Sequence, residues 1–134
     1  MITFLLIDGE NFKNKIKYVF KESGKNKPIW HSYDFKGLLD KVLQGKKINR
    51  TIFYFAKIKE DPQTREKSKQ LIEEQRLLKT YLEKQGFEVI LAGRVRGQME
   101  ESGFSGKQNL VFKEKGVDVK IAVDMVSWSC DKKI

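Results

Sequence analysis

Two short segments near opposite ends of the chain contain the carboxylates best placed for chemistry. The first is FLLIDGEN at residues 4–11, where an apolar run ends at Asp8 and Gly9 permits a sharp turn into a polar helix start. Open α/β sheets bind their ligands in the crevice outside the carboxyl ends of their strands. We therefore predict that Asp8 is a functional residue.

The second segment is KGVDVKIAVD at residues 115–124, which has the pattern of a helix. Helical spacing places Asp124 on the same face as three apolar residues, which are Val117, Ile121 and Trp128. Burial of an unpaired charge is costly, so Asp124 needs a lysine partner, a hydrogen-bond network or a metal ion, and the lysine-rich composition favours the lysine. Asp118 lies near the amino end of the same helix, where a carboxylate favours a capping role.

The carboxylates converge if the last helix packs beside the first strand. Asp8, Asp118 and Asp124 would then meet at one end of the sheet. Carboxylates without histidine or thiol partners suit Mg²⁺ or Mn²⁺, which lower the pKa of bound water and stabilise the leaving oxygen of a phosphodiester. Asn11, one helical turn beyond Asp8, either orients the water or a phosphate or serves as a helix N-cap.

Strand-like and helix-like segments alternate along the chain, as in the βαβ units of a mostly parallel sheet. The strand-like apolar runs are residues 2–7, 28–33, 51–56 and 87–91. Helices are expected over 11–22, from Asp34 to about Gly45, and over 61–86, where Asp61 precedes Pro62 as an N-cap.

The expected core consists of one apolar face on each helix together with aromatic residues of the strands. The helix residues are Phe12, Ile16, Val19, Phe20, Leu38, Leu39, Val42, Leu43, Leu71, Leu77, Leu78, Tyr81 and Leu82. The strand residues are Trp30, His31, Tyr33, Phe53, Tyr54 and Phe55, for which packing explains the pattern better than catalysis or base stacking.

Glycines interrupt the sequence between residues 92 and 116, which predicts a basic loop or an irregular hairpin. Its basic residues are Arg94, Arg96, Lys107, Lys113 and Lys115. A segment of this kind can hold a phosphate backbone, and the alternative is a disordered surface excursion without a binding role.

Length and charge restrict the class of protein. The 134 residues suit one compact domain, and 27 Lys plus Arg against 18 Asp plus Glu give a net charge of +9. This charge suits nucleic acid, although lysines scattered over a solvated surface would give the same count. The single cysteine, Cys130, excludes an internal disulfide, and no apolar run is long enough to span a membrane, so we expect a soluble cytoplasmic protein.

At the two carboxylate segments the chain resembles the NYN domains of the PIN-like ribonuclease superfamily. Asp8-Gly9-Glu10-Asn11 matches the Asp-x-x-Asn element that ends the first strand of these domains, and residues 115–119 match their Lys-Gly-Val-Asp-Val element. Residues 122–125, AVDM, are also similar to the family, and the order of elements is compatible over residues 1–134 as a single domain.

The resemblance implies a Rossmann-like, PIN-type three-layer α/β/α fold with a mostly parallel central sheet. It also implies metal-dependent endonucleolytic cleavage of RNA, with Asp8 and Asp118 as metal ligands, Asn11 in support, and Asp124 in or beside the acidic cluster. The metal would be Mg²⁺ or Mn²⁺. Lys115 and the basic residues before it would guide the RNA.

One departure from the family pattern concerns the end of the chain. Members usually continue into another strand that ends in a Ser-Gly-Asp-x-Asp-like element, which this sequence lacks. We therefore expect a truncated domain whose site is short of at least one carboxylate and whose first strand lies at a sheet edge, unless a second copy covers that edge. This leaves two other hypotheses open: a non-catalytic nucleic-acid-binding or regulatory module of the same fold, and a hydrolase of small phosphoesters.

Overall fold

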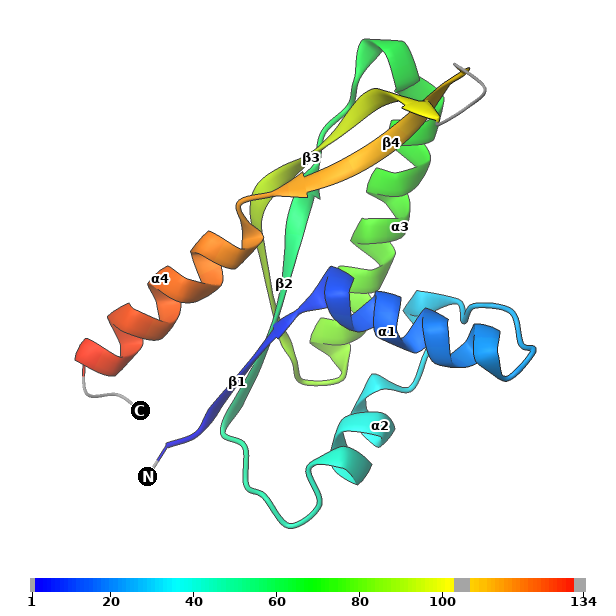
Figure 1. Ribbon diagram of the computed structural model, residues 1–134. Helices are drawn as coiled ribbons and strands as arrows, with labels where there is room; N and C mark the ends of the chain where they lie inside the picture. The colour runs from blue at the N-terminus through cyan, green and yellow to red at the C-terminus, as the bar shows by residue number, and fades with distance from the viewer. Residues whose placement is uncertain (1, 103–106, 132–134) are drawn as a thin grey trace.

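The computed structural model describes residues 2–102 and 107–131, with side chains for 2–93 and 116–131. Helices and strands alternate through most of the chain, as predicted (Figure 1). The strands are β1 (Phe4–Asp8), β2 (Arg50–Ile58), β3 (Glu88–Ser102) and β4 (Lys107–Lys115). The α-helices are α1 (Gly9–Glu22), α2 (Phe35–Val42), α3 (Arg65–Lys84) and α4 (Val117–Cys130), and two short 3₁₀ helices are η1 (Trp30–Ser32) and η2 (Pro62–Thr64).

The described strands form one mostly parallel sheet in the order β1-β2-β3-β4. β1, β2 and β3 run parallel, whereas β4 pairs antiparallel with β3. The predicted α/β fold class is therefore confirmed. Within the described residues β1 lies at a sheet edge, as expected, and its coverage by a second copy stays a prediction.

Helices cover both faces of the sheet, which gives the three layers (Figure 1). α4 packs on one face against Ile52, Tyr54 and Ala56 of β2, and α1, α2 and α3 pack on the other. Successive residues of a strand point to opposite faces, so the alternation along β2 divides the core into two clusters. The predicted apolar face of α4 is confirmed, since Val117, Ile121 and Trp128 all belong to the cluster between α4 and β2.

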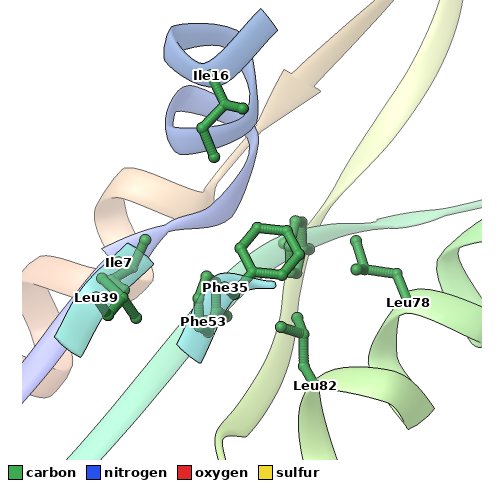
Figure 2. Packing of buried hydrophobic residues seen from close by; sticks show 8 residues of the cluster. Ile7, Ile16, Phe35, Leu39, Phe53, Leu78 and Leu82 are labelled. Atoms are coloured by element: carbon green, nitrogen blue, oxygen red, sulfur yellow. The ribbon is translucent and has the colours of Figure 1, made fainter. Parts of the chain in front are cut away.

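The larger cluster lies between the sheet and the other three α-helices (Figure 2). Its buried residues come from all of these elements and are Ile7, Ile16, Phe35, Leu39, Phe53, Phe55, Leu78 and Leu82. Phe53 lies at its centre, with its ring 5.7 Å from the Phe35 ring and 5.3 Å from the Phe87 ring. This packing fixes α1 against the carboxyl half of β1.

The prediction that Val19 and Val42 are buried is wrong. Val19 is 59% exposed on α1 and Val42 is 68% exposed on α2. Each helix lies on the outside of the sheet and buries only one stripe, and these residues lie just beyond it.

The interpretation of residues 28–33 as a strand is also wrong. Within this segment Trp30–Ser32 form the 3₁₀ helix η1, and the sheet gains no strand from residues 28–33. Its aromatic residues pack on the α2 side, with the Tyr33 ring 4.9 Å from the Phe35 ring, and Tyr81 donates a hydrogen bond to the Tyr33 carbonyl at 2.8 Å. His31 is exposed and takes no part in the core, contrary to expectation.

Of the loop and the irregular hairpin expected for the segment from 92 to 116, the described residues form the hairpin, and residues 103–106 lie outside them. β3 and β4 pair in one uninterrupted register from Arg94 with Lys115 to Ser102 with Lys107. β1 ends at the level of Tyr54 and Ile90, so the hairpin extends beyond the sheet at the end where Asp8 lies. The glycines that suggested a loop are tolerated because cross-strand pairing decides strand formation more strongly than local propensity.

Gly9 is required at the β1–α1 junction, and its replacement gives a testable prediction. It is buried, and an added Cβ would overlap the ring of the buried Phe55. We expect Gly9→Ala to lower the free energy of unfolding in urea by about 1–3 kcal/mol, because neither the helix start nor the ring can shift freely. Phe55→Leu in the same chain should remove the overlap, so the two substitutions together should cost less than their sum. Additive costs would contradict this account.

Candidate functional site

Asp8 is fixed by its position at the end of β1 and by Asn11. It is the N-cap of α1, with Oδ1 accepting from the Asn11 backbone N–H at 3.2 Å and Oδ2 accepting from Asn11 Nδ2 at 3.1 Å. The N-cap role considered for Asn11 is therefore wrong, because Asp8 holds that position. Asn11 donates to both carboxylate oxygens and so sets the orientation of the Asp8 side chain.

The register of the sheet shows which face Asp8 occupies. Asp8 pairs with Tyr54, and Tyr54 pairs with Ile90. Tyr54 and Ile90 both pack toward α4, and residues paired across neighbouring strands point to the same face. Asp8 therefore lies on the α4 face of the sheet, at its carboxyl edge, where it is half-buried.

Asp118 is exposed on the first turn of α4, at the same end of the sheet. Its Oδ1 accepts from the Val119 backbone N–H at 2.9 Å, so it satisfies one of the free donors of that turn. The N-cap itself is Gly116, whose φ of 94° suits glycine and where an added Cβ would lie only 3.1 Å from the Gly93 Cα. This close approach places the start of α4 against β3.

Asp124 is 6% exposed and is held by two partners. Its Oδ2 accepts from the Tyr54 hydroxyl at 2.9 Å, and its Oδ1 forms an ion pair with Lys120 Nζ at 2.9 Å. The expected lysine partner is therefore confirmed, and a hydrogen-bond network accompanies it. Burial raises the pKa of Tyr54, and the hydrogen bond to Asp124 raises it further, so the phenol stays protonated and donates a hydrogen bond to the carboxylate.

Sequence reasoning missed the role of Tyr54, which it assigned to packing alone. Tyr54 is fully buried and also connects two candidate residues, since it neighbours Asp8 in the sheet and donates to Asp124 on α4. The available signal was strand alternation, because Ile52, Tyr54 and Ala56 share the face on which α4 packs.

The candidate carboxylates lie on neighbouring elements but do not form one cluster. Among the residues that the structure describes, no three histidine, cysteine, aspartate or glutamate residues gather closely enough to hold a metal ion. Asp124 is turned toward Tyr54 and Lys120, whereas Asp118 lies on the exposed side of the α4 start. Asp8 and Asp118 remain the pair whose exposure suits a ligand that arrives from solvent.

The donor chemistry of this pair fits a hard divalent ion. Both residues supply carboxylate oxygens, and no thiol or imidazole ligand accompanies them among the residues with described side chains. Mg²⁺ commonly keeps several waters and binds through one or two carboxylates together with phosphates of the substrate. The carboxylates of Asp8 at the sheet edge and of Asp118 on α4 are therefore ligands of the kind that suits a metal that binds together with its substrate.

The predicted nucleic-acid-binding residues can be placed only by their backbone. The side chains of Arg94, Arg96, Lys107, Lys113 and Lys115 lie outside the described part of the structure. In the β3–β4 ladder, Arg94 pairs with Lys115 and Arg96 pairs with Lys113. These four basic positions thus lie at the base of the hairpin, next to the start of α4, whereas Lys107 pairs with Ser102 at the other end of the ladder.

Comparison with known proteins supports the interpretation of the two motifs. The family model for the NYN domain matches residues 3–134, which is nearly the whole chain. Searches of curated proteins and of solved structures found no significant match. None of the helices that the structure describes is long and apolar enough to cross a membrane.

Proposed function

Because this chain belongs to the NYN domain family, a PIN-like nuclease family, we propose that it is a metal-dependent ribonuclease that hydrolyses RNA phosphodiester bonds. The observation that carries the proposal is the geometry of Asp8. Its carboxylate lies at the carboxyl edge of a parallel sheet, where such folds bind ligands, and Asn11 holds both of its oxygens. A residue that only capped α1 would not need the second bond from the Asn11 side chain.

In this proposal Asp8 and Asp118 hold one Mg²⁺ or Mn²⁺ ion. Such an ion, when bound, lowers the pKa of a water and stabilises charge on the leaving oxygen. Asn11 keeps the Asp8 carboxylate in one orientation, so that little reorganisation accompanies binding. Asp118 would bind the ion from the exposed first turn of α4, where a phosphate can approach from solvent.

We assign Asp124 a positioning role in place of a ligand role. Both of its oxygens are engaged, by the Tyr54 hydroxyl and the Lys120 ammonium group. Tyr54 lies beside Asp8 in the sheet. The Asp124–Tyr54 bond therefore ties α4, and with it Asp118, to the strand next to Asp8.

The basic positions of the β3–β4 hairpin, Lys115 among them, supply the substrate contacts in this proposal. The hairpin extends beyond the sheet at the Asp8 end, and the net charge of +9 favours a polyanion. RNA lying along the hairpin base would pass the start of α4 and reach the sheet edge.

Titration of Mn²⁺ into the protein with a labelled single-stranded RNA tests the proposal. We expect cleavage to rise with Mn²⁺ and to stop when a chelator is added, while binding of the RNA persists in the chelator. Binding should weaken steeply with salt because phosphate contacts release counterions. Absence of cleavage at every Mn²⁺ and Mg²⁺ concentration, with RNA still bound, would contradict the enzyme proposal.

A second candidate is a non-catalytic RNA-binding module of the same fold. It is favoured by one observation, namely that no three candidate ligands gather among the described residues. For such a module the carboxylate of Asp8 only caps α1. Binding without cleavage in the titration above would support this second candidate.

A further inference from the structure

A cavity of about 380 Å³ lies on the sheet face opposite α4, close to the Asp8 edge. Its walls come from the start of α1, the segment 27–31, the end of β2 and one side of α3. Glu10, which lies two residues after Asp8, forms part of the rim. The volume is within the range of pockets that bury a small ligand.

The lining combines aromatic, cationic and acidic groups. Trp30 is half-buried and Phe55 is nearly fully buried, and Lys13 Nζ lies 5.4 Å from the centre of the Trp30 ring and 5.9 Å from that of Phe55. Lys13 also forms a 3.5 Å ion pair with Glu10, and its side chain is only 19% exposed. Lys27 and Glu74 complete the charged groups of the lining.

One part of the lining is already rigid. Gln75 donates from Nε2 to the Ala56 carbonyl at 2.7 Å, and its Oε1 accepts from the Ile58 N–H at 3.4 Å. These bonds tie α3 to the end of β2 without a ligand. The α3 wall and the β2 wall of the cavity are therefore joined to each other, and packing of Trp30 on Phe35, with ring centres 6.1 Å apart, supports the aromatic wall.

We propose that this cavity binds a nucleobase of single-stranded RNA beside the site at Asp8. A base has a flat face that stacks on an aromatic ring, and amino groups that donate to carboxylates such as Glu10 and Glu74. Its phosphate is the group that Lys13 and Lys27 would contact. The inference rests on the proposed ribonuclease function, since it names where part of the substrate binds.

Tryptophan fluorescence tests the stacking directly, because the chain has only two tryptophans, Trp30 and Trp128. Trp128 lies on the far side of the sheet, with its ring 5.5 Å from Phe4. The test uses Asp8→Asn protein in chelator, so that nothing is cleaved. With Trp128→Phe added, single-stranded RNA should quench the remaining Trp30 emission and saturate. With Trp30→Phe added in its place, the Trp128 emission should not change.

An abasic residue placed at each RNA position in turn should weaken binding about ten-fold at one position, the one that stacks on Trp30. Quenching of Trp30 by RNA but not by a nucleoside monophosphate would show that the cavity binds a base within an RNA chain. Quenching by the mononucleotide alone, or equal quenching of Trp30 and Trp128, overturns the proposal.

Lys27→Ala is a second test variant, and it should leave the core intact because Lys27 is exposed. Lys25→Ala is its matched control, since Lys25 is also exposed and only Lys27 of the two lines the cavity. Lys27→Ala should weaken RNA binding about three- to ten-fold and lower the salt dependence by about one phosphate contact, while Lys25→Ala should change neither. Equal effects overturn the assignment. Quenching of Trp30, together with no cleavage by the parent protein at any Mn²⁺ or Mg²⁺ concentration, would leave the cavity in place and refute the ribonuclease function. Cleavage by the parent protein that is lost in Asp8→Asn, without quenching of Trp30, would refute the cavity alone.

Discussion

Asp8→Asn is expected to lower metal-dependent RNA cleavage by more than about a hundred-fold, a larger loss than that caused by removing groups that only support metal ligands. Asparagine keeps an acceptor for Asn11 and remains a good helix N-cap, so the fold should persist. The substitution removes the negative charge of the Asp8 carboxylate, which would bind the divalent ion. RNA binding should be unchanged or stronger, because a charge that repels phosphate is lost.

Asp34→Asn is the matched control for this experiment. Asp34 is likewise an aspartate N-cap, on α2, where its Oδ1 accepts from the Gly37 N–H at 2.9 Å. We expect Asp34→Asn to cleave RNA as the parent protein does. Single-turnover cleavage and RNA affinity should be measured for both variants in Mn²⁺. If Asp8→Asn cleaves as well as Asp34→Asn, Asp8 has no part in the mechanism.

The location of Asp8 could be predicted from local sequence, because a strand that ends at an aspartate and a glycine defines its own boundary. The Lys120–Asp124 pair was similarly accessible, since residues four apart on a helix are neighbours. Tyr54 was harder to find because its partner is 70 residues away in the sequence. Only the packing of α4 on β2 brings the two together, and local patterns do not contain that contact.

The same physical cause decided two segments whose structure local composition left wrong or open. Residues 28–33 have the composition of a strand, yet Trp30–Ser32 form a 3₁₀ helix. For residues 92–116 the glycines left a loop and a hairpin both open, and the described residues pair as a hairpin. Strand formation depends on whether a partner edge is available, which tertiary structure decides. β3 offers β4 a free edge, whereas residues 28–33 lie among side chains of α2 and α3.

Removal of the Asp124 carboxylate should be the most destabilising change at the interface between α4 and the sheet. Asp124→Ala leaves the buried Tyr54 hydroxyl without its acceptor and opens a small cavity, so the free energy of unfolding in urea should fall by about 2–4 kcal/mol. Asp40→Ala, an exposed aspartate on α2, should change it by less than about 0.5 kcal/mol. In a double-mutant cycle with Tyr54→Phe, the two residues should show a coupling of at least about 1 kcal/mol.

Cleavage by Asp124→Asn separates a positioning role from a ligand role. Asparagine retains an oxygen that can accept from Tyr54, so α4 should stay in place and Asp118 should remain available. We expect cleavage to fall by less than about ten-fold, well short of the loss in Asp8→Asn. A loss equal to that of Asp8→Asn, in a protein that still melts cooperatively, would mean that Asp124 leaves Lys120 and binds the metal. A weak coupling to Tyr54 together with full activity would instead show that the Asp124–Tyr54 bond does not hold α4 to the sheet.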